Sequence, residues 1–290
     1  RQADGVTGNR LRRWEKSDFK PLPGDIFQER LYAIQWISKE TLDTGRQDTW
    51  FAAPTPADLE REQRVAQLVA ENLTSWQTKG FVPDMAIEPG YNTDQPIRER
   101  GWTHWHHLFT ARQILVAALV HEQIHKMPAD LQSPLYLSFA RMLDWNSKLC
   151  RYGTGAARES ISQTLYNQAF NTFWNYGTRP FGFSRSYLEE PPIRTADITS
   201  VVEIANIPAS ELSTCAELWI TDPPYADAVN YHEITEFFIA WLRKNPPKPF
   251  DDWVWDSRRA LAVKGSGEDF RRGMVAAYKA MADHMPDNGM

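Results

Sequence analysis

The sequence has little cysteine, no long apolar run and no excess of positive charge, and each shortage excludes a class of protein. Its two cysteines, Cys150 and Cys215, are too few for a disulfide scaffold or a cysteine-rich zinc site, which favours a reducing compartment. No apolar run approaches the length of a membrane span and no signal peptide is visible. The sequence therefore predicts a cytoplasmic protein without a membrane partner.

The charge balance bears on nucleic-acid binding. With 32 Lys and Arg against 37 Asp and Glu, the net charge of −5 argues against a uniformly basic nucleic-acid wrapper, although basic patches occur at 9–16 and 256–264. What the chain does have is 42% hydrophobic and 12% aromatic residues over 290 positions, enough for a sizeable core in one large or two small domains. Because it begins with Arg1 and ends on an apparent helix and turn, we expect a fragment of a longer protein.

Capping signals predict the first helices. Thr55 as cap, Pro56 at the first helical position and Gly80 after the last predict a helix over 55–79. The loop that follows contains several prolines and is a suitable place for a boundary between two lobes. We therefore divide the chain into an irregular and helical N-terminal segment, 1–90, and a catalytic-motif region, 91–290, whose C-terminal strands are missing.

The second segment alternates strands and helices. Thr110 and Gln113 predict a helix start, and Pro134 is expected to begin another helix. Further along, short strands are expected in 198–205 and 216–220, in addition to one in 30–37, and the helices 231–244 and 268–284 follow. Alternation of this kind favours an α/β layer with parallel strands.

A pattern typical of zinc proteases occurs at His121-Glu122-x-x-His125. Two histidines four residues apart share a helix face and could bind one metal ion, with Glu122 as general base. No third ligand is evident, and Pro128 and Leu131 occupy the places of the extended motif's glycine and third histidine. Histidines are also common in the last turn of a helix, because the helix C-terminus stabilises positive charge. The zinc-hydrolase hypothesis therefore ranks last, and the neighbouring histidines at 104–107 are interpreted as loop polarity.

A second motif, Asp222-Pro223-Pro224-Tyr225, follows an expected strand and precedes a helix, which places it at the ligand-binding edge of an α/β sheet. These residue types suit methylation of an exocyclic amine. The Asp222 carboxylate and the Pro223 carbonyl could each accept one amino hydrogen and draw the nitrogen lone pair out of conjugation. Pro223 and Pro224 fix the backbone, and Tyr225 would stack on a flipped base. The alternative to a catalytic motif is a proline-rich turn that follows the strand.

The stretch from 221 to 244 resembles motif IV and the following helix of S-adenosylmethionine-dependent amino-methyltransferases. More narrowly, the chain resembles the large adenine-specific DNA methylases that contain a zinc ribbon, and the likeness spans roughly residues 50–290. It is carried also by segments beginning at Gly101, Asn146 and Asn167, and by the terminal MPDNGM.

The resemblance implies a partial Rossmann-like methyltransferase fold with additional helical segments. It makes Phe109 and Thr110 candidate contacts of the S-adenosylmethionine cofactor, and it implies that the glycine-rich cofactor motif and the zinc ribbon lie nearer the N-terminus of the family's proteins. The expected activity is transfer of a methyl group to adenine N6 in DNA, with other defence-system proteins as further partners.

Three alternatives stay open. The chain could be a non-catalytic DNA-binding component with a degenerate site. It could methylate RNA, cytosine N4 or a protein amide, because the same hydrogen-bond geometry suits any planar amine. Zinc-dependent hydrolysis is the third alternative.

Overall fold

The computed structural model describes residues 2–3, 9–10, 31–44, 46–150, 152–155, 158–161, 163–164, 203–223, 231–256, 263 and 267–289. Within these ranges the chain is mostly helical. The helices are α1 (Pro56–Lys79), α2 (Asp94–Arg100), α3 (Ala111–His125), α4 (Ala129–Asp144), α6 (Tyr231–Leu242) and α7 (Gly267–Asp283). Short 3-10 helices are η2 (Lys39–Thr41), η3 (Trp105–Leu108) and η4 (Ala209–Glu211). No described helix has the length and apolar character needed to cross a membrane.

Helix α1 begins and ends as its sequence predicts. The Thr55 hydroxyl accepts the Asp58 backbone N–H, and the Asp58 carboxylate accepts the Thr55 N–H in return. At the other end Gly80 adopts a left-handed φ of 80°. A side chain there would also collide with the turn after α6, because a Cβ on Gly80 would lie 2.5 Å from the Lys244 Cβ. Only glycine meets both requirements.

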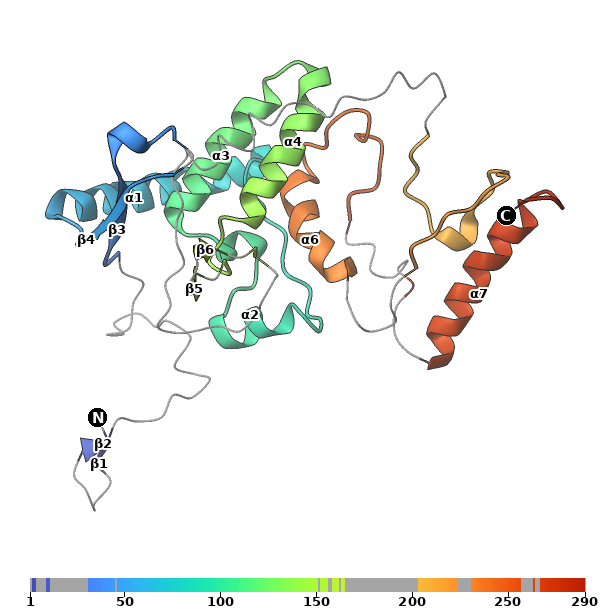
Figure 1. Ribbon diagram of the computed structural model, residues 1–290, viewed down its shortest axis with the longest axis horizontal. Helices are drawn as coiled ribbons and strands as arrows, with labels where there is room; N and C mark the ends of the chain where they lie inside the picture. The colour runs from blue at the N-terminus through green and yellow to red at the C-terminus, as the bar shows by residue number, and fades with distance from the viewer. Residues whose placement is uncertain are drawn as a thin grey trace.

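Helix α3 is the central element of the core. Thr110 and Gln113 form a second capping box, as predicted. The helix is buried on several sides, and it contacts α1 and α4. Figure 1 shows α3 and α4 side by side, with α1 on one side and α6 on the other. Since α1 comes from the first predicted segment and the other three from the second, one core spans the predicted boundary near residue 90.

Helix α4 begins earlier than predicted. It starts at Ala129, with Pro128 as its cap, so that Pro134 lies inside the helix instead of opening it. The turn from α3 supplies the reason, because the Gln132 side-chain amide donates to the carbonyl oxygens of His125 and Met127. These bonds satisfy carbonyls at the end of α3 and hold the first turn of α4 in place. Because Pro134 has no backbone N–H, the helix lacks one backbone hydrogen bond there but continues.

Large aromatic side chains fill the core between α3, α4 and α6. Phe237 and Trp241 of α6 are fully buried. Phe237 packs against Trp105 of η3, and Trp241 packs edge-on against Phe139 of α4. Aromatic pairs of this geometry add favourable contact energy to the burial of their area. Helix α6 is thus anchored on the rest of the helical core.

All strand pairs among the described residues are antiparallel hairpins. They are β1 (Gln2–Ala3) with β2 (Asn9–Arg10), β3 (Ile34–Ile37) with β4 (Thr49–Ala52), and β5 (Tyr152–Gly155) with β6 (Arg158–Ile161). In β3 and β4, Trp36 lies opposite Trp50. Strand β3 confirms part of the strand expected in 30–37.

The strand expected in 216–220 is wrong, because this segment is irregular. Of the strand expected in 198–205, residues 203–205 are irregular and 201–202 and earlier lie outside the described residues. An apolar stretch becomes a strand only when a neighbour satisfies its backbone, and here the Ala216 N–H donates instead to the His284 carbonyl beyond α7. Helix α7 packs against η4, and Figure 1 shows both beside the helical core. The described chain is mostly helical with small hairpins, and the Rossmann-like layer stays a prediction.

Candidate functional site

The motif Asp222-Pro223-Pro224-Tyr225 is described in its first half. Asp222 is exposed and Pro223 is half-buried, at the end of the irregular stretch 212–223 that follows η4. Pro224 and Tyr225 lie outside the described residues. The Asp222 carboxylate is therefore accessible to a large substrate, and the chain resumes at Tyr231 with the start of α6.

Phe109 and Thr110 lie where α3 meets the helix that follows the motif. The Phe109 ring is 4% exposed, stacks on Phe237 with centroids 5.9 Å apart and meets Trp241 edge-on at 5.2 Å. The Thr110 hydroxyl caps α3. The structure thus brings the segment carrying Phe109 against α6. Both side chains are engaged in packing and capping, so their described contacts do not by themselves form a cofactor site.

A buried carboxylate on α6 was missed by sequence reasoning. Glu233 is 4% exposed, and its two oxygens accept the backbone N–H groups of Tyr91 at 2.9 Å and Asn92 at 2.6 Å. The His232 Nε2 lies 3.9 Å from one of these oxygens. A carboxylate this deep requires hydrogen-bond donors, and here two successive backbone amides supply them. Its signal in the sequence is a glutamate on the apolar face of a helix.

The opposite end of α6 is held by ion pairs. The Asp84 carboxylate accepts hydrogen bonds from Arg243 at 2.6 Å and from Lys244 at 2.5 Å. Burial raises the pKa of Asp84, but the bonds and charges of Lys244 and Arg243 outweigh it and leave the pKa below its ordinary value. The side chains of Lys244 and Asn245 also donate to the last carbonyls of α1, at Gln77 and Lys79. Both ends of α6 are therefore attached to the loop region between α1 and α3.

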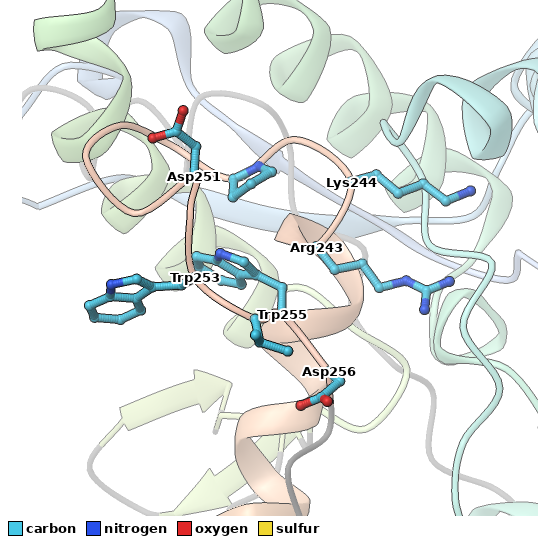
Figure 2. Close-up of a pocket in the computed structure, with 8 residues that line it drawn as sticks. Arg243, Lys244, Asp251, Trp253, Trp255 and Asp256 are labelled. Carbon is cyan, nitrogen blue, oxygen red and sulfur yellow. The ribbon is translucent and has the colours of Figure 1, made fainter. Parts of the chain in front are cut away.

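A hollow of about 400 Å³ lies beyond the C-terminal end of α6, lined by Arg243, Lys244, Pro246, Asp251, Trp253, Val254, Trp255 and Asp256. In Figure 2 the side chains of Arg243 and Lys244 run away from Trp253. Both cations are bound to Asp84, and the Trp255 ring nitrogen donates to the Phe250 carbonyl. Much of the polar lining is thus already engaged, and the hollow lies at the C-terminal end of α6, whereas the motif precedes α6 in the sequence.

The protease-like histidines have separate structural roles. His121 is fully buried, its Nδ1 lies 3.3 Å from the Phe81 carbonyl oxygen, and burial lowers its pKa to about 4. His125 is exposed and touches the Phe81 ring. The Glu122 carboxylate accepts a hydrogen bond from Lys126 at 2.9 Å. Within the described ranges no three His, Cys, Asp or Glu side chains are arranged to hold a metal ion.

The histidines of 104–107 form a tight group, with ring centroids between 4.4 and 5.6 Å apart. The His107 Nδ1 accepts the Thr103 backbone N–H, which leaves a neutral ring with its proton on Nε2. Burial, followed by the charges of His107 and His104, lowers the pKa of His106 to about 4. These histidines do more than make a loop polar. The His106 Nδ1 lies 3.3 Å from the side-chain nitrogen of Gln77, a contact that links η3 to α1.

Comparison with protein-family models, with characterised proteins and with solved structures finds no match for this chain. Its function is therefore argued from its own residues.

Proposed function

We propose that the chain is the catalytic-motif part of an S-adenosylmethionine-dependent amino-methyltransferase that acts on adenine N6 in DNA. The observation that carries the proposal is the motif Asp222-Pro223-Pro224-Tyr225, whose Asp222 is exposed, followed in the sequence by a helix whose apolar face packs on Phe109. In this proposal Asp222 and the Pro223 carbonyl bind the two amino hydrogens of the target base, and Tyr225 stacks on its ring. S-adenosylmethionine, when bound, supplies the electrophilic methyl group.

The packing of α6 on Phe109 supports the proposal because it brings the helix that follows the motif against the segment that the resemblance makes a candidate cofactor contact. The motif and the candidate cofactor segment are more than a hundred residues apart in the chain, yet the helix after the motif contacts Phe109 directly. Chemistry between a base and a cofactor requires the two binding segments to be close and fixed. The attachment of both ends of α6 adds rigidity to this arrangement.

The test is methyl transfer from labelled S-adenosylmethionine to mixed DNA and RNA, with identification of the modified nucleosides by mass spectrometry. We expect N6-methyladenine from the wild-type protein and a loss of at least about 100-fold in Asp222→Ala, the size typical when one preorganised polar contact to a reacting group is removed. Asp252→Ala, which removes another exposed loop aspartate, serves as the matched control and should retain full activity.

Each other outcome selects an alternative. Label in RNA, in cytosine or in protein with the same dependence on Asp222 would keep the chemistry and change the substrate. DNA binding without cofactor binding would favour the non-catalytic component. Full activity of a correctly folded Asp222→Ala protein would refute the role of the motif.

A further inference from the structure

We propose that Tyr91 stacks on a nucleobase of the substrate strand, and that Glu233 positions it for this contact. The inference rests on the proposed function and names a substrate contact of the same site. Tyr91 lies outside the motif from which the function was inferred, and no pattern in the sequence distinguishes it.

Exposure makes Tyr91 unusual. Its side chain is 86% exposed, against 58% for Tyr32, 52% for Tyr231 and 46% for Tyr278, the other exposed tyrosines of the described chain. A ring this far into solvent adds almost nothing to the core. Its phenol gives it a polar end and its ring gives it a stacking face, the two properties that aromatic residues use at nucleic-acid surfaces.

The backbone under this exposed ring is held firmly. Glu233 binds the N–H groups of both Tyr91 and Asn92. The loop is also closed on itself, since the Thr93 hydroxyl donates to the Glu88 carbonyl at 2.6 Å and the Asp94 N–H donates to the Gly90 carbonyl at 2.9 Å. Thr93 is only 3% exposed. An aromatic ring on a fixed backbone loses little conformational entropy on binding, which is the property expected of a contact residue.

The loop is attached to the helix that follows the motif in the sequence. Glu233 lies in the first turn of α6. Tyr91 is therefore fixed to the N-terminal end of the helix that follows the motif, by a carboxylate 142 residues away in sequence.

The experiment measures the Kd of a labelled, adenine-containing single-stranded DNA oligonucleotide and the KM for the same strand in methyl transfer. We expect Tyr91→Ala to raise both by about 5- to 100-fold, the range for loss of one base-stacking side chain. Tyr91→Trp should restore both to within about threefold of wild type, because indole also stacks. Tyr32→Ala is the matched control, an exposed tyrosine just before β3, and should change neither.

Glu233→Gln tests the positioning role. The amide keeps one acceptor oxygen and presents a donor to a backbone N–H, so one of the two bonds is lost. We expect a raised Kd in the wild-type background and no further rise in the Tyr91→Ala background. A merely structural glutamate would add its effect equally in both backgrounds.

The outcomes separate this inference from the function on which it rests. Wild-type values in Tyr91→Ala, beside an inactive Asp222→Ala, would overturn the contact and leave the function standing. A Tyr91→Trp protein as weak as Tyr91→Ala would overturn stacking. A wild-type protein that neither binds the oligonucleotide nor methylates it would overturn both proposals.

Discussion

Gly80 shows how one residue can determine a junction between distant segments. It ends α1 in the left-handed conformation, and a Cβ there would approach the Lys244 Cβ to 2.5 Å and the Asn245 amide nitrogen to 2.6 Å. Gly101, which ends α2 with a φ of 68°, has no atom within 4 Å of the same position. The two glycines share the backbone requirement and differ in crowding.

We expect Gly80→Ala to lower the free energy of unfolding by roughly 2–5 kcal/mol, the sum of left-handed strain and overpacking. Gly101→Ala should lose only the strain, about 1–2 kcal/mol. Urea unfolding followed by circular dichroism measures both. Equal losses in the two variants would mean that the turn after α6 is not held against the end of α1.

The same residues show what a sequence can and cannot reveal about a site. Thr55, Thr110 and Gly80 were predicted correctly because capping depends on neighbours within four positions. The contacts of Glu233 with Tyr91 and Asn92 cross more than 140 residues, and no local rule encodes such a pairing. The burial of Phe109 under α6 escaped prediction for the same reason.

Helix α6 carries the connection between the motif and the core. Phe237 is fully buried against Trp105, Phe109 and Phe238, so its removal would open a cavity at the junction. We expect Phe237→Ala to cost roughly 3–5 kcal/mol of unfolding free energy. Tyr231→Ala, an aromatic change on the exposed side of the same helix, should stay within about 0.5 kcal/mol of wild type.

Urea unfolding of the two α6 variants checks this expectation. A loss below about 1 kcal/mol in Phe237→Ala would show that α6 contributes little to the core. It would also remove the packing argument from the proposed function, while leaving the chemistry of the motif to be tested by Asp222→Ala.

Helices were predicted better than strands. The helices α1, α3, α6 and α7 agree with the predicted ranges to within a few residues, because caps and apolar periodicity are local. The predicted start of α4 was wrong. Pro134 suggested that the helix begins there, but the hydrogen bonds of Gln132 hold an earlier turn in place. The strand in 216–220 was wrong because a strand needs a partner, and the sequence names none.

Acid should destabilise the molecule as a whole, because His121 is buried, and His106 and His107 are half-buried, in neutral form. Burial lowers the pKa of His121 and of His106 to about 4, against an ordinary value near 6.5, and it lowers the pKa of His107 as well. The groups that face His121 are the Phe81 carbonyl and the rings of Phe81, Tyr136 and Phe139, none of which is charged at neutral pH. The positive form of His125 also opposes protonation of His121, but by less than burial does.

The sign of the effect follows from proton binding. Between about pH 6.5 and pH 4 the unfolded chain binds protons at these histidines and the folded chain does not, so stability is full above pH 6.5 and falls as the pH falls. We expect His121 alone to remove about 2 kcal/mol between pH 7.5 and pH 5. Urea unfolding at these pH values should therefore give a smaller loss in His121→Gln than in wild type, whatever the variant's stability at pH 7.5. His125→Gln, at an exposed position on the same helix, should keep the wild-type slope, and an unchanged slope in His121→Gln would show that this histidine does not control the response.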